Sequence, residues 1–169
     1  GKRIVYRTGV PMHFETFDIA SGVKAAILSH PRYHVHAGKY SPDMRWIAFH
    51  LAPGDGPSHM FIVPARDGNP PPEPEWIPVY TRPGYNNRPF WSADGNTLYF
   101  LSDSEGAVAL FAQRLDPATK RPRGDPFQVF RPAGQYFFGL AGHYLGPAEG
   151  PGYAVIPLTR NQANVWLAE

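Results

Sequence analysis

Short apolar segments recur along the chain, and turn-forming residues separate them. Residues 47–50 (IAFH) and 98–101 (LYFL) are dense in β-branched and aromatic side chains and are too short for an amphipathic helix, so we predict buried strands. The chain contains 20 Pro and 17 Gly among its 169 residues, which leaves almost no uninterrupted stretch for a long helix. The pattern predicts an all-β fold of short strands joined by many turns.

One sequence pattern occurs twice, at a separation of 51 residues. Residues 40–68 align with residues 91–117, and each copy contains an aromatic residue, a Ser-x-Asp turn, a strand, a Gly-containing loop and a second strand. In the turn, the Asp side chain accepts hydrogen bonds from backbone amides, and Gly95 supplies the positive φ that tight hairpins require. The first copy has Met44, a weaker turn former, at the position of Gly95.

Partial copies of the pattern flank the two complete ones. The N-terminal copy lacks the first strand of a four-stranded unit and comprises residues 3–9 and 14–22. The C-terminal copy lacks the fourth strand and comprises residues 142–147, 153–159 and 164–169. Edge strands are predicted at residues 25–30, 75–81 and 127–132, for roughly fourteen short strands in all.

Repeats of roughly 50 residues with four strands each are typical of the blades of a β-propeller. We therefore predict an all-β propeller of about three and a half four-stranded antiparallel blades. Its parts are a partial blade (1–32), two blades (33–83 and 84–134) and a partial last blade (135–169). Because the outer blades would expose an apolar face and an unpaired strand edge, we expect a fragment of a larger ring or a homo-oligomer that completes the ring.

The segment SPDMRWIAF (residues 41–49), followed by MFIVPARDG (60–68), resembles the WD40-like repeat of TolB and of the propellers in dipeptidyl-peptidase and tricorn-type proteins. The ending TRNQANVWLAE (159–169) resembles the last blade of bacterial TolB-like propellers. The resemblance covers nearly the whole chain. It implies six to eight blades in the complete ring and an extracytoplasmic, periplasmic domain that senses ligands or binds other proteins.

Charge and composition exclude several classes of partner. The net charge is only +2 and basic residues are interspersed with acidic ones, so we expect no nucleic-acid binding. Cysteine is absent, which excludes disulfides and thiolate metal sites. No run of about 18 apolar residues and no signal-peptide core are present, so we expect no direct membrane insertion and place any export signal upstream of this chain.

Repeat equivalence predicts where a binding site would lie. The 51-residue shift places His34 and His36 at the positions of Tyr85 and Asn87, just before the innermost strand of each blade, where the chain enters the central channel. Ordinary loop polarity is the alternative explanation for these polar residues. The predicted site for a protein partner or small ligand comprises His34, His36, Tyr85, Asn87, Arg88, Gln135 and Tyr136.

No catalytic or metal-binding motif is recognisable. The serines form no GxSxG elbow, and turn formation accounts for Ser41 and Ser92. HExxH and other spaced ligand sets are absent, so we expect no metal, no cofactor and no catalytic residue. The sequence favours a non-catalytic scaffold that binds through its channel-mouth loops. Two alternatives are the propeller of a peptidase-like hydrolase whose catalytic domain lies outside this chain, and lectin-like sugar binding.

Overall fold

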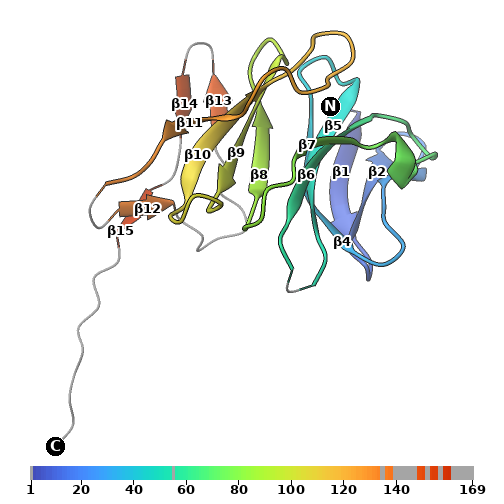
Figure 1. Ribbon diagram of the computed structural model, residues 1–169. Helices are drawn as coiled ribbons and strands as arrows, with labels where there is room; N and C mark the ends of the chain where they lie inside the picture. Colours follow the sequence, from blue (N-terminus) through green and yellow to red (C-terminus); the bar gives the residue numbers. More distant parts are fainter. Residues whose placement is uncertain are drawn as a thin grey trace, which may run out of the picture.

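Antiparallel sheets make up the computed structural model, which confirms the predicted all-β class. The structure describes residues 2–54, 56–133, 136–138, 148–150, 153–155 and 158–160. In the described part of the chain, the one helical element is a single 3-10 turn, η1 (Glu73–Glu75). Figure 1 shows the sheets standing side by side in chain order.

Three sheets account for the first eleven strands. The first sheet has the strand order β1-β2-β3, with bounds Arg3–Thr8, His13–Asp18 and Lys24–Leu28. The second has the order β4-β5-β6-β7, with bounds His34–Tyr40, Trp46–Ala52, His59–Pro64 and Ile77–Tyr80. The third has the order β8-β9-β10-β11, with bounds Asn87–Trp91, Thr97–Ser102, Ala109–Arg114 and Phe127–Phe130.

The C-terminal strands form two pairs. Strand β12 (Tyr136–Phe138) pairs with β15 (Leu158–Arg160), and β13 (Ala148–Gly150) pairs with β14 (Tyr153–Val155). The prediction of one strand over residues 153–159 is wrong, because this segment contributes to two strands with different partners. The other segments predicted here, residues 142–147 and 164–169, lie outside the described residues.

The sheets pack face to face through apolar side chains that alternate along each strand. On β5, Ile47 and Phe49 lie in the core shared with the first sheet, whereas Ala48 lies in the core shared with the third sheet. Phe49 is fully buried and meets the ring of Trp76 edge-on, with 4.9 Å between centroids. Because both faces of the second sheet are covered, β5 is apolar at the successive positions Ile47, Ala48 and Phe49, as the sequence pattern predicted.

The Ser-x-Asp turns have the same hydrogen bonds in both copies. Ser41 Oγ donates to Asp43 Oδ1 (2.6 Å) and accepts from the backbone N–H of Trp46 (3.0 Å). In the third sheet, Ser92 Oγ donates likewise to Asp94 Oδ1 (2.5 Å). These bonds hold the pKa of the Asp43 and Asp94 carboxyls below their usual value. The two serines are therefore turn-forming residues, as predicted.

Met44 occupies a backbone conformation that disfavours any residue except glycine. Its φ is 60°, and its repeat equivalent Gly95 has a φ of 67°. A side chain in this region costs about 1 kcal/mol, so Met44→Gly is expected to raise the free energy of unfolding by roughly that amount. Urea denaturation measures the change.

The matched substitution is Gly95→Ala. A Cβ at this position meets Pro42 Cδ at 3.4 Å, which is an ordinary contact. Gly95→Ala is therefore expected to lower the free energy of unfolding by about 1 kcal/mol through the backbone conformation alone. A loss of stability in Met44→Gly would contradict this explanation.

Candidate functional site

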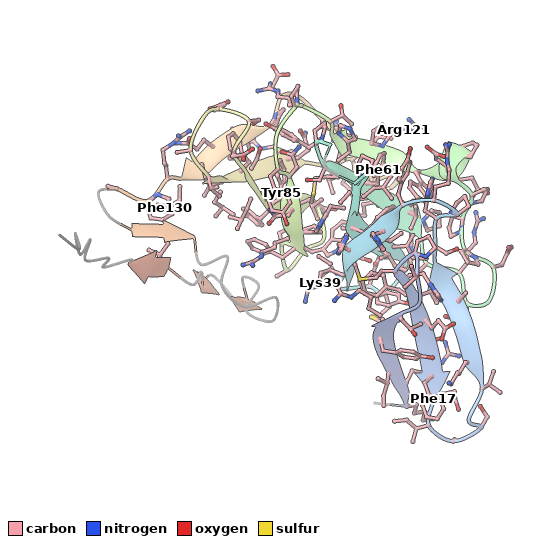
Figure 2. The ribbon with its side chains drawn as sticks, turned by 90° about the horizontal axis from the view of Figure 1, so that it is seen from below. Phe17, Lys39, Phe61, Tyr85, Arg121 and Phe130 are labelled. Carbon is pink, nitrogen blue, oxygen red and sulfur yellow. The ribbon has the colours of Figure 1, made fainter. Side chains whose placement is uncertain are left out.

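The first strands of the second and third sheets, β4 and β8, carry the same irregularity near their starts. Each has a bulge in its pairing with the next strand, and the bulged residues Ala37 (φ 52°) and Arg88 (φ 54°) lie 51 positions apart. A bulge bends the strand and redirects its side chains, and non-glycine residues with positive φ concentrate at functional sites. Figure 2 shows Tyr85, which precedes β8, and Lys39 of β4 well separated from Arg121 in the loop after β10.

Histidine and tyrosine rings gather beside these bulges. His36 on β4 is the direct cross-strand partner of His50 on β5, and their rings stack with 5.1 Å between centroids and 10° between planes. The ring of Tyr85 meets that of His50 edge-on at 6.5 Å. His50 follows Phe49 on β5, so its side chain lies on the opposite face from that residue and is directed toward the third sheet. A contiguous polar and aromatic cluster therefore spans the second and third sheets.

Cationic side chains surround the buried member of this cluster. His50 is 6% exposed, and burial lowers the pKa of its imidazole to about 3, with further lowering by His36, Arg88 and Arg7. Arg7 on β1 lies 3.4 Å from His36, measured from Nη1 to Nδ1. The His50 ring is therefore neutral near pH 7, and within the described part of the chain its buried Nδ1 has no hydrogen-bond partner. A buried nitrogen of this kind can donate or accept one hydrogen bond with a ligand.

Asn86 fixes the loop that carries Tyr85. Its buried side-chain amide donates to the backbone carbonyls of Ser58 (2.6 Å) and Arg82 (2.8 Å), and its Oδ1 accepts from Ser102 Oγ (2.6 Å). Sequence reasoning missed this residue. The sequence did contain a signal for it, because the 51-residue shift pairs Asn86 with the apolar residue Val35 of the first copy. Val35 is fully buried in the structure.

The structure brings three of the predicted site residues together. His36, Tyr85 and Arg88 lie around His50, which was not predicted as a member of the site. His34 lies beside His36, with ring centroids 5.9 Å apart, and its Nδ1 accepts a hydrogen bond from the backbone N–H of Met12 in the first sheet.

Asn87 is directed away from this cluster. Asn87 pairs with Leu101, whose side chain packs on the opposite face of the third sheet from His50. The Oδ1 atom of Asn87 is buried and finds no hydrogen-bond partner in the ranges that the structure describes. Gln135 lies outside the described residues, and for Tyr136 the structure gives only its place in β12, paired with Arg160.

Neither a metal centre with three protein ligands nor a membrane helix is present in the described ranges. No group of three or more His, Asp or Glu side chains there is arranged to hold a metal ion. No helical segment there has the length and apolarity needed to cross a bilayer.

Two solved structures share this fold. A TolB-assigned protein from Agrobacterium tumefaciens superposes with a TM-score of 0.58 at 22% identity, over 77% of this chain and 46% of its own. TolB from Acinetobacter baumannii superposes with a TM-score of 0.63 at 14% identity, over 94% of this chain and 38% of its own. The resemblance noted from the sequence is thus confirmed at the level of the fold, a TolB-like β-propeller, and the chain spans less than half of either structure. No protein-family model and no curated protein matches the sequence.

Proposed function

We propose that this chain is a non-catalytic propeller scaffold that binds a protein partner or a small ligand at its channel mouth. The cluster of His36, His50, Tyr85 and Arg88 is the proposed site. The observation that carries the proposal is the buried Nδ1 of His50, which has no hydrogen-bond partner among the described residues although it lies among polar side chains.

The repeat itself supports a functional reason for His50. Leaving a buried polar atom unpaired costs about 1 to 3 kcal/mol, and the fold does not require a polar residue here. The equivalent position in the third sheet is Leu101, which is 1% exposed and packs with Phe90 and Leu110. A histidine at this position therefore lowers stability unless a ligand pairs with it.

The two similar structures also support a proposal about the complete ring and the compartment of this chain. The two similar structures come from bacteria, and both chains are more than twice as long as the portion matched here. We place the chain in a propeller ring that is completed by further blades or by a second copy, in the bacterial periplasm. The exposed apolar residues of β11, Phe127, Val129 and Phe130, are consistent with a surface that such a neighbour would cover.

A ligand screen tests the site. We expect compounds or peptides that raise the melting temperature of the native chain to lose this effect when His36, Tyr85 and Arg88 are all replaced by Ala. Arg121→Ala removes an exposed cation far from Tyr85 (Figure 2) and is the matched control. Ligands that stabilise the triple variant as well as the native chain would contradict the proposed site, as would a screen in which nothing binds.

A further inference from the structure

A polar cluster of Tyr6, His13 and Glu15 lies on the face of the first sheet that is turned away from the second sheet. Phe14 packs in the core shared with the second sheet, so its neighbours on β2, His13 and Glu15, are directed to the opposite face. Tyr6 on β1 is the direct cross-strand partner of Glu15. The side chains of His13 and Glu15 are 28% and 24% exposed, so ions in solution can reach them.

The fold does not require a polar cross-strand pair at this place. In the second sheet, the repeat puts Phe49 and Phe61 at the positions of the tyrosine and the glutamate of this cluster. Those two rings stack with 5.7 Å between centroids. The next cross-strand pair on the same face of the first sheet, Ile4 and Phe17, is apolar as well. The polar cluster is therefore a local departure from both the repeat and its own surroundings.

The hydrogen bonds of His13 determine which ring nitrogen presents a lone pair to Glu15. The Nδ1 atom lies 3.1 Å from the carbonyl oxygen of Pro11, which can only accept, so Nδ1 carries the proton. The Nε2 atom lies 3.4 Å from Glu15 Oε1. In the neutral form of His13 two acceptor atoms therefore face each other, an arrangement that a cation between them stabilises. Gly9 makes room for this ring, since a Cβ there would lie 2.3 Å from His13 Cε1.

Both side chains also have the outer hydrogen bonds that are usual for metal ligands. The Tyr6 hydroxyl donates to Glu15 Oε2, which leaves Oε1 for an ion. This bond, with further contributions from His13 and Lys24, holds the pKa of the Glu15 carboxyl below its usual value, so the group is ionised near pH 7. Donation from Nδ1–H to a backbone carbonyl is a common way to orient a metal-binding imidazole.

We propose that His13 Nε2 and Glu15 Oε1 bind a divalent transition-metal ion of the zinc type on this outward face. An ion about 2.1 Å from both atoms would make an N–Zn–O angle of about 110°, close to the tetrahedral value. Water completes the coordination, because no third His, Asp or Glu side chain joins the pair within the described ranges. This site is separate from the proposed channel-mouth site and goes beyond the proposed function.

The test is isothermal titration calorimetry with zinc chloride on the full 169-residue chain, with magnesium chloride as the control ion. We expect saturable binding of zinc and none of magnesium, which prefers oxygen ligands and retains its water. The zinc affinity is expected to rise from about pH 6 to about pH 7.5, because zinc competes with the proton for His13 Nε2. Absence of saturable zinc binding, or equal binding of magnesium, would overturn the proposal.

Variants link the zinc affinity to the named atoms. We expect Tyr6→Phe to weaken zinc binding about tenfold by releasing the carboxylate, and His13→Gln and Glu15→Gln to weaken it further by removing a ligand. His59→Gln is the matched control, because the repeat pairs His59 with His13 but has Phe61 in place of the glutamate. Circular dichroism verifies that each variant is folded. A loss of affinity in His59→Gln as large as that in His13→Gln would contradict the assignment of the site.

The imidazole ¹⁵N signals of the native chain give a second measurement that requires no variant. Zinc is expected to shift the ring signals of His13 and to leave those of His59 unchanged. His13 signals that respond to pH but not to zinc would show that a proton alone bridges His13 and Glu15, and would overturn the proposal.

Discussion

Replacing Asn86 with Ala is expected to lower the free energy of unfolding by about 3 to 5 kcal/mol. The Asn86 side chain is fully buried and joins three parts of the fold: the start of β6 through Ser58, the loop at Arg82 and the end of β9 through Ser102. Truncation leaves the backbone carbonyls and a hydroxyl buried without these partners, and each such loss costs about 1 to 3 kcal/mol. Urea denaturation monitored by tryptophan fluorescence measures the effect.

The neighbouring residue provides the control. Asn87 has the same side chain and is almost as buried, but its Oδ1 has no hydrogen-bond partner among the residues that the structure describes, so Asn87→Ala breaks no described bond at that atom. We expect it to cost about 1 kcal/mol or less. Similar losses in the two variants would show that burial, and not the hydrogen-bond network of Asn86, determines the stability of this loop.

The second large effect is a dependence of stability on pH that His50 causes. Burial and the neighbouring cations lower the pKa of folded His50 to about 3, against an ordinary value of 6.5. As the pH falls below 6.5, the unfolded chain takes up a proton that the folded chain cannot, so folding stability is lost between pH 6.5 and about 3. From pH 7 to pH 4 this one group accounts for a loss of about 3 kcal/mol.

His50→Leu removes this contribution by installing the residue that the third sheet has at the equivalent position, Leu101. Its unfolding free energy is expected to equal or exceed that of the native chain at pH 7, and to fall by about 3 kcal/mol less between pH 7 and pH 4. The Asp43 and Asp94 carboxyls have lowered pKa values and lose their stabilising effect below the ordinary value of 3.8, so they do not obscure this window. Parallel pH profiles for the two proteins would contradict the explanation.

The repeat made most of the fold predictable. Ser-x-Asp turns, apolar strands and glycines recur at a fixed separation, and each of these features has a local physical cause that can be recognised without the structure. The equivalence extends to the backbone, since Met44 matches Gly95 and Ala37 matches Arg88 in positive φ. Where the repeat degrades, after residue 134, local signals no longer defined the strands, and the segment 153–159 was assigned to one strand instead of two.

The candidate site was predictable only in part, because its members come from different sheets. Repeat equivalence predicted His36, Tyr85 and Arg88 from their place before or within the first strand of a unit. It did not predict His50, whose position depends on cross-strand register, or Arg7, which comes from another sheet. It also grouped Asn87 with these residues, although the alternation of side chains along β8 directs it to the other face.

The imidazole ¹⁵N signals of the chain provide the most direct test of the site, recorded with and without the tightest ligand from the screen. The ring signals of His36 and His50 are expected to shift on binding. His30 is the internal control, because its buried ring accepts hydrogen bonds from the backbone of Arg32 and Tyr33 and belongs to the structural core beside Trp76. Unchanged signals of His36 and His50 in the presence of a saturating ligand would contradict the proposed binding site.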